Sequence, residues 1–167
     1  MKQKLLTVAI PAYNRPETIR LTLETLKNEN LDLFTLLVSD DSSTSAVEEV
    51  VKNYQEAMPN LRYKKNLVNL GYSANVAQLY ELADTRYIWF LCDDDTVNQG
   101  AITKILSALK KYEPVVAIFN CTWNDSFGRK LTAGVNSDVV HSDIDAFENY
   151  NVIVRTTFFS ILVVEKR

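Results

Sequence analysis

Glycine is scarce in this sequence, and no glycine-rich phosphate-binding loop is present. The four glycines are scattered, and neither a GxGxxG nor a GxxxxGK[ST] pattern occurs. The first pattern is typical of dinucleotide-binding folds and the second of Walker-type sites, because both bring backbone N–H groups close to phosphate oxygens. The sequence therefore argues against both classes, and a bound diphosphate would have to be held by a metal ion instead.

Histidine, cysteine and long apolar runs are scarce as well. His141 is the single histidine and has no triad motif around it, which argues against a histidine-based nucleophilic triad. Cys92 and Cys121 are too few for a zinc site, and both lie in apolar runs where buried, reduced thiols are expected. No apolar run approaches the roughly 18 residues of a spanning helix. The net charge of −3 offers no basic surface for nucleic acid.

These absences predict a cytoplasmic protein without a transmembrane segment and without a nucleic-acid partner. Peripheral association with a membrane is compatible with them. The 167 residues, 47% of them hydrophobic, are enough for one domain with a core.

Short apolar runs alternate with segments of helical periodicity along most of the chain. The first helix, for example, is indicated by Ile19, Leu23 and Leu26, with Asn14 as its expected cap. Such alternation predicts βαβ units, hence an α/β domain with a mostly parallel sheet flanked by helices. The irregular segment 121–140 is compatible with a hairpin, and a short helix is expected at 142–150. The expected strands are 5–10, 34–38, 61–64, 87–91, 115–120 and 158–164.

Three loops that follow expected strands carry polar groups: 11–15, 39–43 and 92–95. Ligands of parallel sheets bind beyond the carboxyl ends of the strands, so these loops should converge on one edge. The last loop contains Asp93, Asp94 and Asp95 directly after a buried strand. Mg²⁺ often binds between carboxylates and substrate phosphates, so the pattern suggests a metal–diphosphate site. A solvated acidic turn is the alternative.

Four motifs, in this order and spacing, resemble those of the family-two nucleotide-sugar glycosyltransferases. They are Ile10-Pro11-Ala12-Tyr13-Asn14-Arg15, Ser39-Asp40-Asp41-Ser42-Ser43, Asn69-Leu70-Gly71 with Asn75, and Trp89-Phe90-Leu91-Cys92-Asp93-Asp94-Asp95. The resemblance covers about residues 5–120 closely and the remainder loosely. The last motif looks most like the bacterial branch that builds capsular and O-antigen polysaccharides.

The resemblance implies a glycosyltransferase A fold with a Rossmann-like sheet, a nucleoside-diphosphate sugar donor, Mn²⁺ or Mg²⁺, and transfer with inversion to a polysaccharide acceptor. A donor of the UDP or dTDP type is favoured because an ionised Asp41 only accepts hydrogen bonds and uracil and thymine offer an N3–H. Pro11 and Tyr13 would flank the base and ribose, and Asp41 would accept a hydrogen bond from the base. Asp94 would bind the metal, and Asp93 would contact the metal site or the ribose. Asn75 matches a polar position near the donor. Cys92 fills the first place of the family's Asp-x-Asp motif.

The resemblance also implies two halves, residues 1–120 for the nucleotide sugar and 121–167 as the start of an acceptor half. The general base is expected beyond residue 167, with Asp138, Asp143, Asp145 and Glu148 as default candidates. Two other functions stay open: a nucleotide-sugar-binding module without turnover, and a nucleotidyltransferase. The second is disfavoured because 11–15 contains no glycine. Asp40 and Asp41 could instead cap the helix after Ser45.

Overall fold

The structure is a computed structural model that describes residues 3–42, 44–119, 121–124, 129–133 and 162–166. A six-stranded sheet in the order β3-β2-β1-β4-β8-β5 forms its centre. Five strands point in one direction, and β8, which lies between β4 and β5, is antiparallel to both of them. These strands are β1 (Leu6–Ala12), β2 (Phe34–Asp40), β3 (Leu61–Lys65), β4 (Tyr87–Phe90), β5 (Val116–Ile118) and β8 (Leu162–Glu165).

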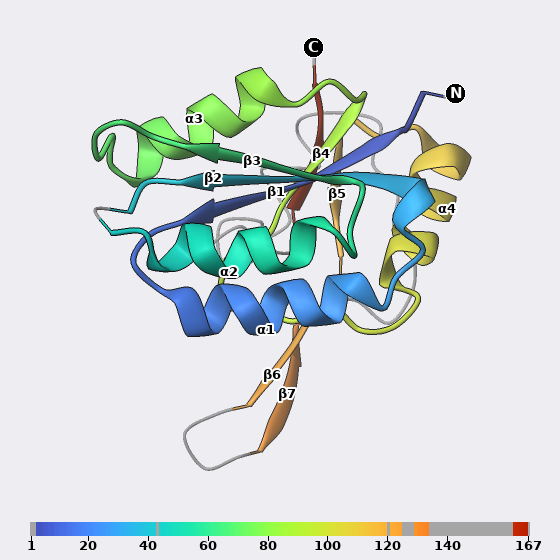
Figure 1. Ribbon diagram of the computed structural model, residues 1–167. Coiled ribbons are helices and arrows are strands. Elements are labelled where there is room, and N and C mark those ends of the chain that lie inside the picture. Colours follow the sequence, from blue (N-terminus) through green and yellow to red (C-terminus); the bar gives the residue numbers. More distant parts are fainter. Residues whose placement is uncertain (1–2, 43, 120, 125–128, 134–161, 167) are drawn as a thin grey trace.

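Helices cover both faces of the sheet (Figure 1). Alternate residues of β1 point to opposite faces, which gives the sheet two separate apolar layers. Leu6, Val8 and Ile10 pack in the larger layer, with residues of α1 (Pro16–Lys27), α2 (Ala46–Gln55) and α4 (Ala101–Tyr112). Ala9 packs in the smaller layer beneath α3 (Tyr72–Leu82). The chain thus moves outward from β1 to β3 over one face and returns to β4 over the other.

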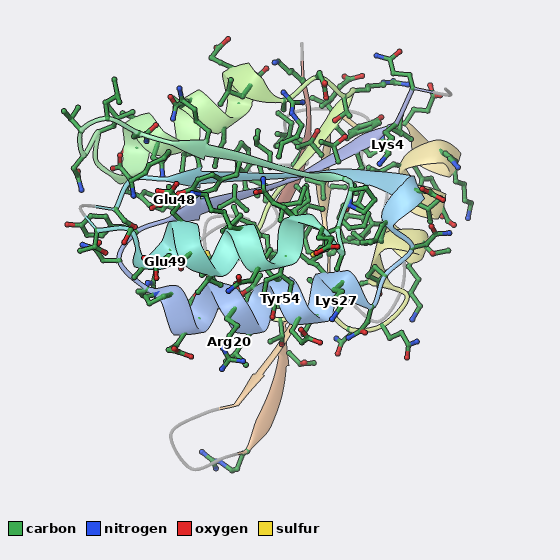
Figure 2. All side chains as sticks on the ribbon, viewed as in Figure 1. Lys4, Arg20, Lys27, Glu48, Glu49 and Tyr54 are labelled. Atoms are coloured by element: carbon green, nitrogen blue, oxygen red, sulfur yellow. The ribbon has the colours of Figure 1, made fainter. Side chains whose placement is uncertain are left out.

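Polar contacts tie α1 to α2 on the outer side of the larger layer. The Tyr54 hydroxyl donates to Glu24 Oε2 at 3.0 Å, and the Lys27 ammonium lies 6.0 Å from the centre of the Tyr54 ring (Figure 2). Burial, together with the Glu24 carboxylate, raises the pKa of Tyr54. The two helices therefore form a joined layer under the strands that carry the first two polar loops.

The predicted alternation of strands and helices is confirmed, and local details differ. Asn14 does not cap α1: the N-cap is Arg15, and Asn14 has a positive φ of 51° while its backbone N–H donates to Ser42 Oγ. The predicted hairpin is formed by β6 (Cys121–Asn124) and β7 (Lys130–Ala133). The expected helix at 142–150 lies outside the described residues.

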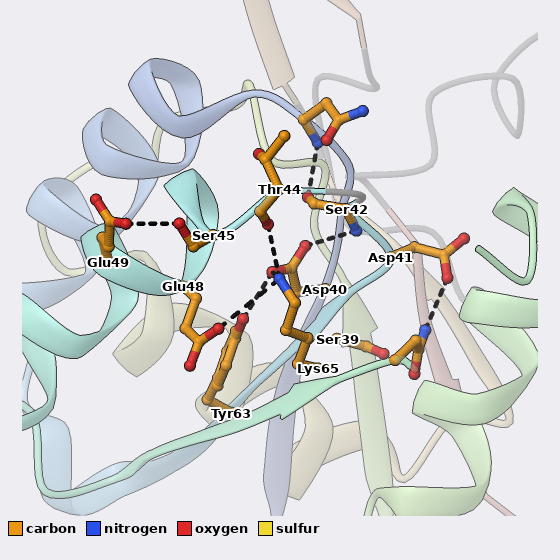
Figure 3. Close-up of polar contacts among 12 residues, drawn as sticks. Ser39, Asp40, Asp41, Ser42, Thr44, Ser45, Glu48, Glu49, Tyr63 and Lys65 are labelled. Atoms are coloured by element: carbon orange, nitrogen blue, oxygen red, sulfur yellow. Dashed lines mark hydrogen bonds and ion pairs between the residues drawn. The ribbon is translucent and has the colours of Figure 1, made fainter. Parts of the chain in front are cut away.

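A fully buried carboxylate, that of Asp40, joins the ends of β2 and β3 (Figure 3). Its Oδ1 accepts from the Ser42 N–H at 2.8 Å, and its Oδ2 accepts from the Tyr63 hydroxyl at 2.6 Å. Lys65 Nζ lies 3.5 Å from the same Oδ2 and donates to the Thr44 carbonyl at 2.7 Å. Burial and the hydrogen bond to Asp40 raise the pKa of Tyr63. The cluster fixes the start of the 41–45 loop.

Replacing Asp40 by alanine should therefore destabilise the fold. Asp40→Ala leaves the Tyr63 hydroxyl, the Ser42 N–H and Lys65 without their shared acceptor, so we expect a loss of about 3 kcal/mol in the free energy of unfolding. Urea denaturation followed by circular dichroism measures it. Asp84→Ala is the matched control, because Asp84 forms an exposed pair with Arg62 and should cost less than about 1 kcal/mol. Equal losses in the two variants would contradict the structural role of Asp40.

Candidate functional site

One pocket of about 400 Å³ opens at the carboxyl edge of the parallel strands. It lies where the chain order reverses between β1 and β4, the position at which ligands bind in open α/β sheets. Eleven residues line it: Pro11, Ala12, Tyr13, Arg15, Asp41, Asn69, Gly71, Tyr72, Asn75, Cys92 and Asp93. The structure thus brings together Pro11, Tyr13, Asp41, Asn75 and Asp93, all of them candidates from the sequence.

The three consecutive aspartates after β4 differ sharply in environment. The Asp93 side chain is 2% exposed and that of Asp94 is 48% exposed. Arg15, the N-cap of α1, bridges the two: its guanidinium lies 2.7 Å from Asp93 Oδ1 and 2.9 Å from Asp94 Oδ2. Arg15 therefore supplies positive charge to both carboxylates from the loop after β1.

Burial dominates the electrostatics of Asp93. It raises the pKa of this carboxyl to about 6, because desolvation penalises the charged form. The Arg15 charge opposes that rise, and the Asp94 charge adds to it. Asp93 Oδ2 is buried and has no hydrogen-bond partner among the described residues. A buried carboxylate oxygen of this kind can still accept a ligand.

The turn from Cys92 to Asp95, which we call the acidic turn, also fits a divalent cation. Ligand atoms of Cys92, Asp94 and Asp95 lie within 4.8 Å of one another. Carboxylate oxygens are the ligands that Mg²⁺ and Ca²⁺ prefer, and Asp94 is exposed and Asp95 partly exposed, while Cys92 and Asp93 of the same turn line the pocket. The grouping joins Asp94 to Cys92 and Asp95, whereas the nearest cation to Asp93 is Arg15.

Asp41 holds the loop between β3 and α3. Its carboxylate accepts hydrogen bonds from the Leu70 N–H, from the Gly71 N–H at 2.9 Å and from Asn66 Nδ2 at 2.9 Å. Gly71 has a φ of 81°, the left-handed backbone expected for it, which turns its N–H toward Asp41. The Leu70 N–H contacts both carboxylate oxygens, so three donors make four hydrogen bonds, two on each oxygen of Asp41. Asp41 does not cap α2, whose N-cap Ser45 makes no side-chain cap bond.

Both the nitrogen and the oxygen of the Asn75 side-chain amide form hydrogen bonds within the protein. Its Nδ2 donates to the Ser39 carbonyl at 3.1 Å, and its Oδ1 accepts from Asn66 Nδ2 at 3.3 Å. It is 2% exposed and lines the pocket from α3. Tyr13, by contrast, is 50% exposed at the pocket's mouth. Asn75 thus supports the wall, and Tyr13 offers a free ring face.

Sequence reasoning did not assign a role to Arg15, Asn66 or Tyr72. Arg15 stands inside one of the quoted motifs, and the excess of carboxylates over cations at this edge was the signal that could have identified it. Asn66 and Tyr72 come from the β3–α3 loop and the start of α3, where no single residue pattern marks them. His141 and the default base candidates lie outside the described residues, as does most of the 121–167 segment.

Membrane-spanning helices are absent from the part of the chain that the structure describes, since none there is both long and apolar enough.

Curated proteins that resemble this chain are glycosyltransferases. It is 27% identical over 119 residues to the GalNAc(5)-diNAcBac-PP-undecaprenol beta-1,3-glucosyltransferase of Campylobacter jejuni, a match that covers 70% of this chain and 38% of that protein. It is 31% identical over 120 residues to the amylovoran biosynthesis glycosyltransferase AmsB of Erwinia amylovora, covering 68% of this chain and 38% of the relative. The chain therefore spans well under half the length of these relatives.

Solved structures share the fold. Residues 1–349 of TarS from S. aureus, in complex with UDP-GlcNAc, superpose with a TM-score of 0.74 at 17% identity, over 97% of this chain and 45% of that one. The mannosyltransferase PcManGT from Pyrobaculum calidifontis, in complex with GDP-Man and Mn²⁺, gives a TM-score of 0.58 at 20% identity, over 70% of this chain and 35% of that one. The predicted glycosyltransferase A fold is thus confirmed. Residues 7–166 match the model of glycosyl transferase family 2, and the chain belongs to that family.

Proposed function

We propose that this chain binds the nucleoside-diphosphate sugar in a metal-dependent, inverting glycosyltransferase that transfers the sugar to a polysaccharide acceptor. UDP and dTDP are the favoured nucleotides, and Mn²⁺ or Mg²⁺ the cation. Residues 1–120 would hold the donor. The single observation that carries the proposal is the pocket at the β1/β4 edge, where Tyr13, Asp41 and Asp93 come from three separate loops to line one space.

Different residues of the site would contact different parts of the nucleotide-sugar donor. The exposed ring of Tyr13 is free to stack on a base, and the Asp41 carboxylate, which lines the pocket, would accept the N–H of that base. Asp94 would hold the cation, and the unpartnered Oδ2 of Asp93 would accept a hydrogen bond from the ribose or from bound water. A bound divalent cation supplies charge stabilisation for the diphosphate leaving group. The inverting step also requires a general base on the acceptor hydroxyl, which belongs to the acceptor half.

Support for the nucleotide sugar comes from two solved structures that share the fold. The TarS structure contains UDP-GlcNAc and the PcManGT structure contains GDP-Man with Mn²⁺. The glucosyltransferase of Campylobacter jejuni is named for an undecaprenol-linked acceptor. A saccharide acceptor, in a pathway of polysaccharide biosynthesis, is consistent with these names.

The role of Asp94 is tested by Asp94→Asn. The amide keeps the size of the side chain and removes its charge, so we expect UDP affinity in excess Mn²⁺ to fall roughly tenfold or more. Isothermal titration calorimetry with UDP, in Mn²⁺ and separately in EDTA, measures both affinities. In EDTA the variant and the wild type should bind UDP alike.

Asp32→Asn serves as the matched control, because Asp32 is exposed in the 3-10 helix Leu31–Leu33 and does not line the pocket. It should leave both affinities unchanged. If the wild type bound UDP equally well with Mn²⁺ and with EDTA, the metal dependence would be wrong.

The base contact of Asp41 is tested by nucleotide preference. A carboxylate only accepts hydrogen bonds, and uracil and thymine offer an N3–H where cytosine presents a bare N3. An unpaired polar group costs about 1–3 kcal/mol on desolvation, so UDP and dTDP should bind about tenfold more tightly than CDP. Asp41→Ala should abolish that ratio. Titration of the three nucleotides in excess Mn²⁺ measures it.

Asn66→Ala separates the base contact from the loop contacts. It removes one donor to Asp41 and keeps the carboxylate, so it should weaken UDP and CDP by the same factor and preserve their ratio. A UDP preference that survives Asp41→Ala would assign Asp41 to holding the β3–α3 loop alone.

A further inference from the structure

A row of polar side chains on α1 faces the chain segment that leaves β4. Thr22 and Thr25 lie one turn apart on the helix, and Glu29 follows one turn beyond them, just past its end. Thr22 is fully buried and Glu29 is 8% exposed. We call these three residues the polar row of α1. None of them belongs to the four family motifs or lines the pocket.

The polar row binds the backbone of residues 93–102 along its length. Thr22 Oγ1 lies 3.0 Å from the Asp93 carbonyl oxygen, 2.8 Å from that of Asp95 and 3.2 Å from that of Thr18 in its own helix, and these three acceptors share its one proton. Thr25 Oγ1 accepts from the Val97 N–H at 3.0 Å. The Glu29 carboxylate accepts from the N–H groups of Gly100 and Ile102, at the start of α4. A carboxylate at a helix start is also favoured by the helix dipole.

Thr22 occupies the decisive place in this row. Besides the Thr18 carbonyl of its own helix, two carbonyls on either side of Asp94 converge on its one hydroxyl, and that of Asp95 is the nearest at 2.8 Å. With these carbonyls turned toward α1, the side chains of Asp93 and Asp94 meet Arg15 on the pocket side. A valine at this position would have nearly the same shape and no donor, which would release both carbonyls and the tight turn from Cys92 to Asp95.

We propose that Thr22 is a positioning residue of the donor site: its hydroxyl sets the direction of the acidic turn and thereby the affinity for a nucleoside diphosphate with its cation. The inference rests on the proposed function, because the turn is taken to hold the cation there. Thr22 touches no substrate itself and acts through the backbone of Asp93 and Asp95.

Thr22→Val is the test, with Thr22→Ser as its rescue and Thr7→Val as the matched control. Thr7 is also a fully buried threonine, whose hydroxyl lies 2.7 Å from that of Thr85 near the opposite end of β1. Thr22→Val should weaken UDP binding in excess Mn²⁺ about tenfold, a difference of about 1.4 kcal/mol. It should leave UDP binding in EDTA unchanged. Thr22→Ser should bind within about twofold of the wild type, because it keeps the donor.

Thermal unfolding of all variants separates positioning from general destabilisation. Thr7→Val should lower Tm and leave Mn²⁺-dependent UDP affinity unchanged. If Thr7→Val weakened UDP binding as much as Thr22→Val did, or if Thr22→Val bound UDP like the wild type, the positioning role would be overturned.

Amide hydrogen exchange distinguishes failure of this inference from failure of the proposed function. Thr22→Val should speed exchange at Asp95 and Val97, and Thr7→Val should not. A wild type without Mn²⁺-dependent UDP binding would refute the proposed function, and exchange at Asp95 and Val97 would still decide what Thr22 holds. Unchanged exchange there in Thr22→Val would overturn the inference.

Discussion

Three carboxylates buried at one edge of a parallel sheet are the constraint on which this structure depends. Asp40, Asp41 and Asp93 are each at most 4% exposed, and a buried charge is costly unless cations or hydrogen-bond donors surround it. Different partners compensate each carboxylate: a lysine and a tyrosine for Asp40, backbone N–H groups for Asp41, and an arginine for Asp93. These ion pairs and hydrogen bonds determine the shapes of the loops around the pocket.

Because their partners differ, the three carboxylates differ in their capacity to bind a ligand. Asp40 is fully buried, its partners all come from inside the protein and it does not line the pocket, so it serves the fold. Asp41 accepts four hydrogen bonds and organises the β3–α3 loop at the wall of the pocket. Asp93 keeps an unpartnered oxygen, and beside it Asp94 reaches solvent. Capacity for a ligand thus rises from β2 toward β4, in the direction of the acidic turn.

Much of the fold and the location of the site could be predicted from the sequence, because both depend on local patterns. Apolar runs indicated the strands, and the polar residues after them indicated which edge would bind a ligand. Partners between distant segments could not be predicted this way. Arg15 meets Asp94 across 79 positions, and Asp41 receives the Leu70 N–H across 29. In the sequence, Asp93 and Asp94 look equivalent, and only packing makes one buried and the other exposed.

The place of β8 in the sheet sets an order for folding during synthesis. Within the described chain, β5 joins the sheet solely through β8. β8 in turn pairs with β4, with Tyr87 opposite Glu165 and Trp89 opposite Val163. The ribosome therefore releases β1 to β4, with the acidic turn, long before the strand that covers the outer edge of β4. Between the synthesis of β4 and that of β8 this edge presents unpaired backbone groups that can pair with other strands, so the nascent chain is exposed to aggregation during that interval.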